Sequence, residues 1–116
     1  MEDFVTFNIA KKLKDKGFQD LCNYYYRIDT GTLFASHKDN WNDDKRCNAP
    51  TISQVMKWLR DEKKMYIEIC YNYTYYFPIV KLIDCHQTDY VSGRDVYKTY
   101  EEAALAGIEY VLDNIL

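Results

Sequence analysis

Residues 99–116 constrain the fold of this chain more than any other segment. Thr99 lies three residues before Glu102, the spacing of a capping box, in which each side chain bonds a free backbone amide at a helix start. Apolar residues then recur at helical spacing: Ala104, Leu105, Ile108, Val111, Leu112 and Ile115. This pattern predicts an amphipathic helix whose apolar stripe must be buried. Gly107 inside it costs up to about 1 kcal/mol relative to alanine, which predicts a close packing contact there.

Two further segments predict helices. Residues 6–16 carry apolar residues on one side and several lysines toward their end, where cations suit the helix dipole. Gly17 follows at the position that favours a left-handed backbone. Residues 51–64 begin with Thr51, three residues before Gln54, which is again a capping spacing. These two helices and the closing one leave the middle segments of the chain for strands.

The segments between the helices resemble two strand pairs. The first pair covers residues 21–28 and 32–36, and the second covers residues 65–71 and 75–84. Pro78 interrupts the last strand, which predicts an edge position or a bulge. The polar segments 37–50 and 86–98 predict surface loops.

Together these elements predict an α+β fold in which residues 1–116 form a single domain of order αββαββα. Hairpins pair their strands antiparallel, so we expect a small sheet of about four strands with the three helices packed on one face. The chain has 12 tyrosines, a residue that favours strands and half-buried surfaces. The opposite face of the sheet is therefore expected to be tyrosine-rich and partly open.

Composition argues against several classes of protein. The net charge of −3 is unlike the basic excess of most nucleic-acid binders. No apolar run approaches the roughly 20 residues that span a bilayer, and the acidic N-terminus does not look like a signal peptide. Four cysteines, at positions 22, 47, 70 and 85, show neither zinc-ribbon nor disulfide-scaffold spacing. We therefore expect a cytoplasmic protein with free thiols and no membrane segment.

No pattern in the sequence supports catalysis, a metal or a cofactor. Cys85 and His86, with His37, Cys47 or Asp84, are the best metal candidates, but adjacent strand residues point in opposite directions. Both histidines lie in predicted loops, and no nucleophile motif surrounds a cysteine. The four glycines are scattered and form no phosphate-binding loop. The sequence therefore predicts a protein that is not an enzyme and has no cofactor.

Three stretches carry a resemblance to a known group of proteins. They are DFVTFNIAKKLK at residues 3–14, APTISQVMKWLR at residues 49–60 and YEEAALAGIE at residues 100–109. Together they resemble small uncharacterised proteins of Bacteroides and of phages and mobile elements of gut Bacteroidetes. The resemblance covers about a third of the chain and implies a bacterial cytoplasmic setting. That group has no assigned activity, so the resemblance transfers no functional residue.

Two functions remain as hypotheses. The first is a protein–protein interaction module that binds an unidentified partner through aromatic residues on hairpin tips and loops: Trp41, Tyr73, Tyr75 and Tyr76. The alternative is a nucleic-acid-binding accessory protein that contacts phosphates through a basic helix face: Lys57, Arg60, Lys63 and Lys64. The oligomeric state is open in both.

Overall fold

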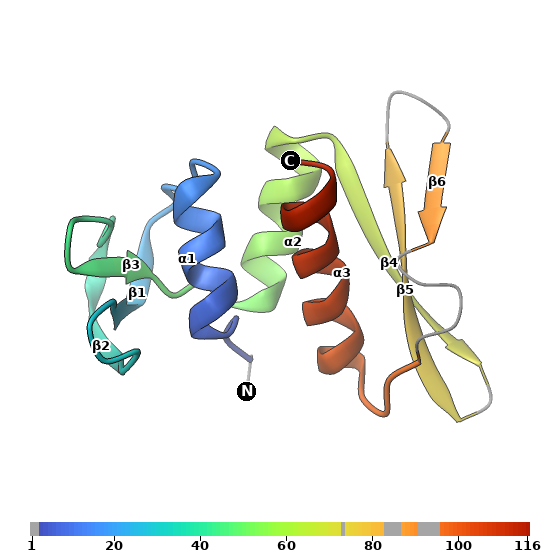
Figure 1. The fold of residues 1–116 in the computed structure, drawn as a ribbon, viewed down its shortest axis with the longest axis horizontal. Helices are drawn as coiled ribbons and strands as arrows, with labels where there is room; N and C mark the ends of the chain where they lie inside the picture. The colour runs from blue at the N-terminus through green and yellow to red at the C-terminus, as the bar shows by residue number, and fades with distance from the viewer. Residues whose placement is uncertain (1–2, 73, 83–86, 91–95) are drawn as a thin grey trace. The chain divides into compact units, whose positions relative to one another are not determined.

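The computed structural model describes residues 3–72, 74–82, 87–90 and 96–116. It confirms the α+β class, with three helices and two antiparallel sheets in the described residues (Figure 1). The chain divides into two compact units, unit 1 (residues 1–51) and unit 2 (residues 52–116). Each unit contains one of the two sheets.

The elements follow one another in a regular order. They are α1 (Phe7–Asp15), β1 (Cys22–Arg27), β2 (Leu33–Asp39), β3 (Arg46–Asn48), α2 (Ile52–Glu62), β4 (Met65–Asn72), β5 (Tyr75–Leu82), β6 (Gln87–Tyr90) and α3 (Tyr100–Asn114). The predicted order of helices and hairpins, αββαββα, is confirmed, and a short third strand follows each hairpin. The prediction of one sheet of about four strands is wrong. The two hairpins belong to separate sheets, of strand order β2-β1-β3 and β4-β5-β6.

The ends of α1 are fixed by local hydrogen bonds. The Thr6 hydroxyl accepts from the Ile9 amide at 3.3 Å, as an N-cap does. At the other end Gly17 has φ +90, and the amide of Phe18 donates to the Leu13 carbonyl at 3.0 Å. This is the Schellman arrangement, which glycine favours because it has no Cβ. The predicted end of this helix is confirmed, and Phe18 folds back to become fully buried.

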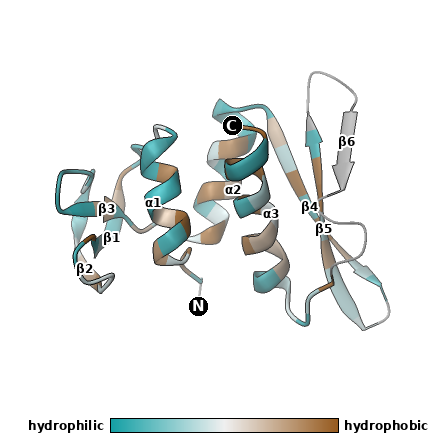
Figure 2. Ribbon diagram, viewed as in Figure 1, coloured by the Kyte–Doolittle hydropathy of each residue, from teal (hydrophilic) through white to brown (hydrophobic). Residues whose placement is uncertain are grey.

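The core of unit 1 lies between α1 and one face of its sheet. The Tyr26 ring contacts Phe7 on α1, with ring centroids 5.5 Å apart. Its hydroxyl donates to the Val5 carbonyl at 2.7 Å, which satisfies the polar end of a buried ring. Burial raises the pKa of the Tyr26 phenol. Figure 2 shows the alternation of hydrophilic and hydrophobic residues around α1 that this packing requires.

The segment 37–50, predicted as a surface loop, is largely ordered by asparagine side chains. Asn48 is only 2% exposed and sits on β3. Its side-chain oxygen accepts from the Trp41 amide at 2.6 Å, and its side-chain nitrogen donates to Asn40 at 2.8 Å. The Asn48 amide in turn donates to the side chain of Asn42 at 2.9 Å. The polar composition thus serves an internal network, and the loop prediction is wrong for β3 and for the end of β2.

In unit 2, α3 packs on the sheet at a site where only glycine fits closely. α3 contacts β4 and β5, while α2 contacts β4 and α3. A Cβ atom on Gly107 would lie 3.0 Å from Ile67 and 3.1 Å from Pro78. The close contact predicted at this glycine is therefore confirmed. So is the N-cap of α3, since the Thr99 hydroxyl accepts from the Glu102 amide at 3.1 Å.

Pro78 lies on β5, the central strand of its sheet, and pairs with Ile69 on β4. The edge position predicted for it is therefore wrong. Two positions earlier, Tyr76 exchanges backbone hydrogen bonds with Tyr97 at 2.8 Å. Backbone groups two residues apart in a strand point the same way, so the Pro78 nitrogen also points away from β4. The missing N–H of proline therefore leaves the β4–β5 ladder intact.

Candidate interaction surface on the β1–β3 sheet

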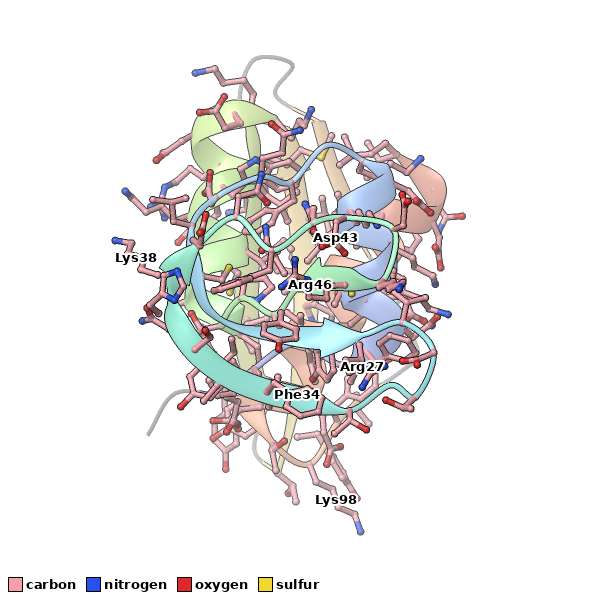
Figure 3. The ribbon with its side chains drawn as sticks, turned by 90° about the vertical axis from the view of Figure 1, so that its left-hand side faces the viewer. Arg27, Phe34, Lys38, Asp43, Arg46 and Lys98 are labelled. Atoms are coloured by element: carbon pink, nitrogen blue, oxygen red, sulfur yellow. The ribbon has the colours of Figure 1, made fainter. Side chains whose placement is uncertain are left out.

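The face of the unit 1 sheet turned away from α1 carries a continuous group of rings and an arginine. Phe34 on β2 is the register partner of Tyr25 on β1, and their rings stack at 5.6 Å. The Trp41 ring also packs against Tyr25, with ring centroids 5.1 Å apart. The guanidinium of Arg46 lies 5.5 Å from the Tyr25 ring and 5.3 Å from the Trp41 ring. We call this face, defined by Tyr25, Arg27, Phe34 and Arg46, the outer face (Figure 3).

Asp43 holds Arg46 in place on the outer face. One carboxylate oxygen accepts from the amides of Lys45 and Arg46 at 2.9 and 2.8 Å. The other accepts from Nε of Arg46 at 2.8 Å and from its terminal nitrogen. These bonds from Arg46 lower the pKa of Asp43 to about 2 and raise the pKa of Arg46. The guanidinium is therefore fixed in orientation before any ligand arrives.

The charges of the outer face are balanced. Arg27 pairs with Asp29 at 2.8 Å, as Arg46 pairs with Asp43. Phe34 remains 38% exposed beside them, and all seven residues of β2 are exposed. A surface with exposed rings, oriented arginines and paired charges has the composition of protein–protein contact sites.

Trp41, predicted as an exposed contact residue, is 9% exposed and belongs to the core of unit 1. Its indole N–H donates to the Cys22 carbonyl at 2.9 Å, and its backbone is held by Asn48. The prediction that a loop displays this ring is therefore wrong. The Trp41 ring contacts Tyr25 and Arg46 of the outer face. The exposed ring of this surface is instead Phe34, the register partner of Tyr25, which the sequence does not single out because a lone phenylalanine in a strand carries no distinguishing signal.

The other predicted contact residues lie in unit 2, at the β4–β5 hairpin. Tyr73 falls outside the described residues. Tyr75 is 41% exposed, and Tyr76 is half-buried, with its ring 5.0 Å from that of Tyr71. The hairpin tip therefore displays Tyr75, as predicted, whereas Tyr76 is packed among other rings. A binding role for these residues stays a prediction.

The basic helix face proposed for nucleic-acid contact is partly neutralised. Lys57 and Arg60 both approach the carboxylate of Asp61, at 3.9 and 3.6 Å. Lys63 lies over the ring of Trp58 at 5.3 Å, and Lys64 follows the helix end with φ 58. Two of the four cations thus share one acid within the helix, which weakens their attraction for phosphate.

A pocket of about 370 Å³ lies in unit 2 and combines both signs of charge. Its lining residues come from α2, β4 and the start of α3: Ser53, Met56, Lys57, Arg60, Tyr66, Ile67, Glu68, Ile69 and Tyr100. Lys57 and Arg60 already meet Asp61, and Glu68 bonds Lys81 at 2.7 Å. Each charged side chain of the lining thus has an oppositely charged partner.

The candidate metal ligands do not meet in the part of the chain that the structure describes. His37 is exposed on β2, and Cys47 is buried on β3, where burial raises the pKa of its thiol. Residues 84–86 lie outside the described residues. Elsewhere in that part no three His, Cys, Asp or Glu side chains gather closely enough to hold a metal ion. The described helices are all too short or too polar to cross a membrane.

Comparisons of this chain with protein-family models, with curated proteins and with solved structures find no match. The resemblance to proteins of Bacteroides and its phages therefore stays a prediction.

Proposed function

We propose that this chain is a small non-enzymatic protein–protein interaction module and that the outer face of unit 1 is its contact surface. The observation that carries the proposal is the stack of Phe34 on Tyr25 beside Arg46, which Asp43 holds in a fixed orientation. Rigid rings and a preoriented guanidinium lose little conformational freedom on binding, so the ordering cost that opposes affinity is small.

The balance of charge favours a protein partner over a nucleic acid. Both arginines of the outer face have a carboxylate partner, and so have Lys57 and Arg60 on α2. A phosphate backbone would have to compete with these acids. We also propose a reducing, cytoplasmic setting, in keeping with the free thiols of Cys47 and Cys70.

The proposal is tested by affinity capture from a Bacteroides lysate with three tagged baits: wild type, Phe34→Ser and Tyr71→Ser. Phe34 lies on the outer face, whereas Tyr71 is a more exposed ring on the hairpin of unit 2 and serves as the matched control. We expect a partner that wild type and Tyr71→Ser retain and that Phe34→Ser loses. Each capture is repeated after nuclease treatment.

Two outcomes would overturn this proposal. If the Phe34→Ser bait captures the same partner as wild type, the contact does not lie on the outer face. Loss of every captured protein after nuclease treatment would favour nucleic-acid binding, and the same experiment with Lys57→Gln and Arg60→Gln would then follow.

A further inference from the structure

The strand β2 has one side without a partner in the described sheet. It lies at the edge of the order β2-β1-β3, paired with β1 alone, and all seven of its residues are exposed. An edge strand of this kind presents a row of backbone donors and acceptors to which another strand can bond.

The register shows which backbone groups face outward. The Arg27 amide donates to the Thr32 carbonyl at 2.9 Å, and the same register pairs Tyr25 with Phe34. In an antiparallel ladder the bonding direction alternates, so Phe34 points its backbone groups toward β1. Leu33 and Ala35 therefore point their N–H and C=O groups toward the open edge.

The side chains of the same segment are uncharged, and three of the four are apolar. Residues 33–36 read Leu-Phe-Ala-Ser, and Leu33 and Phe34 are 37% and 38% exposed. Beyond Ala35 the register with β1 shifts, and the strand ends in His37, Lys38 and Asp39. Irregular register and charge both discourage pairing, so the open edge is usable over residues 33–36.

We propose that β2 pairs antiparallel with β2 of a second copy of this chain, with the twofold axis at Phe34. In this register Leu33 of each copy lies opposite Ala35 of the other, and their outward backbone groups bond one another. Phe34 then faces its own counterpart at a non-hydrogen-bonded position, where cross-strand side chains approach most closely. This inference rests on the proposed function, because it joins two outer faces into one surface.

The self-complementary pattern favours a second copy over a different strand. Each phenylalanine already stacks on Tyr25, so pairing produces a ladder of four rings, Tyr25–Phe34–Phe34–Tyr25, across the axis. When segment 33–36 pairs with the same segment of a second copy, no charged side chains are placed opposite one another. Pairing centred on Lys38 would instead place two lysines opposite one another. The contact is short, so we expect weak, concentration-dependent association.

Sedimentation velocity from about 5 µM to about 1 mM tests the pairing, since this range covers weak dimers. We expect wild type to shift from monomer toward dimer. Ala35→Pro removes one outward N–H from each copy and leaves the bonds to β1, so it should weaken association by about 10-fold or more. Ala35→Val keeps the N–H and is the matched control.

A second variant and a second measurement keep the test decisive if Ala35→Pro perturbs the fold. Phe34→Lys places like charges at the axis and should also give a monomer. In wild type, the amide hydrogens of Leu33 and Ala35 should exchange more slowly as concentration rises. A monomer at the highest concentration, or a dimer without this protection, overturns the pairing.

Failure of this inference and failure of the proposed function give different results. A monomeric wild type that still captures a partner through Phe34 overturns only the pairing. A dimer that captures nothing through Phe34 overturns only the proposed contact with another protein.

Discussion

Gly107 on α3 lies so close to Pro78 on β5 that a Cβ atom added to the glycine would be 3.1 Å from the proline Cβ. Ile67 Cγ2 closes the other side of the same position at 3.0 Å. Neither neighbour can move easily, because Pro78 is held by its own ring and Ile67 is buried in β4. The glycine therefore sets how closely the helix approaches the sheet.

We expect Gly107→Ala to lower the free energy of unfolding by about 1 kcal/mol. The overpacking cost of about 1–3 kcal/mol outweighs the gain of about 1 kcal/mol in helix propensity. Urea unfolding measures the difference. In the control Ala106→Gly, a neighbouring residue loses helix propensity without a packing change of this kind. A more stable Gly107→Ala protein would contradict the close contact.

At Lys64, by contrast, a substitution should raise the free energy of unfolding. Its φ of 58 follows α2 in the left-handed region, which costs an L-residue with a Cβ about 1 kcal/mol. We expect Lys64→Gly to raise the free energy of unfolding by up to about 1 kcal/mol. Lys64→Ala removes the same charge and keeps the Cβ, so it should show no such gain in the same urea experiment.

Asn48 should be among the polar residues most costly to replace. Asn48→Ala leaves the Trp41 amide without its 2.6 Å acceptor, and an unsatisfied buried amide costs about 1–3 kcal/mol. We expect thermal unfolding to show a loss of that size. Asn114→Ala removes an exposed bond to the Tyr110 carbonyl and should change stability by less than about 0.5 kcal/mol. Equal effects of the two substitutions would contradict a structural role for Asn48.

The lowered pKa of Asp43 predicts a specific dependence of stability on pH. Its pKa is lowered from 3.8 to about 2, chiefly by the hydrogen bond from Arg46, so the folded state favours the ionised form. The resulting stabilisation is complete above about pH 4 and is lost as the pH falls from there through about 2. The difference in unfolding free energy between wild type and Asp43→Asn should therefore shrink as the pH is lowered from about 4 to about 2. In Arg46→Gln, an NMR titration should place the Asp43 pKa nearer 3.8.

The prediction that residues 1–116 form a single domain can be tested with the two tryptophans. Trp41 lies in unit 1 and Trp58 in unit 2, so Trp58→Phe and Trp41→Phe each leave one fluorescent reporter. In a single cooperative domain, fluorescence and far-UV circular dichroism give the same urea midpoint within each variant. Two separate midpoints would show that the units unfold independently.

Local features of the fold could be predicted from the sequence, and long-range ones could not. The cap at Thr99 and the end of α1 at Gly17 depend on neighbours within five residues, so short motifs suffice. Which hairpins share a sheet depends on contacts between distant segments, and the hydrophobic pattern is the same for one sheet or two.

The candidate surface shows the same division. Only the register of the strands shows that Phe34 lies beside Tyr25. The asparagine and aspartate residues around Trp41 predict an exposed loop, yet Asn40, Asn42 and Asn48 bond one another. A polar segment can be an internal network when its side chains satisfy its own backbone, and composition does not distinguish that from a solvated loop.

The strand order β2-β1-β3 also has a consequence for synthesis. The middle strand β1 is made first, and it can pair with β2 through a short turn as soon as the chain reaches residue 39. Until residues 46–48 emerge, this hairpin has two open edges, and α1 lacks its contacts with β3. A ribosome that pauses just before these codons would hold unit 1 in the state most exposed to pairing with other nascent chains.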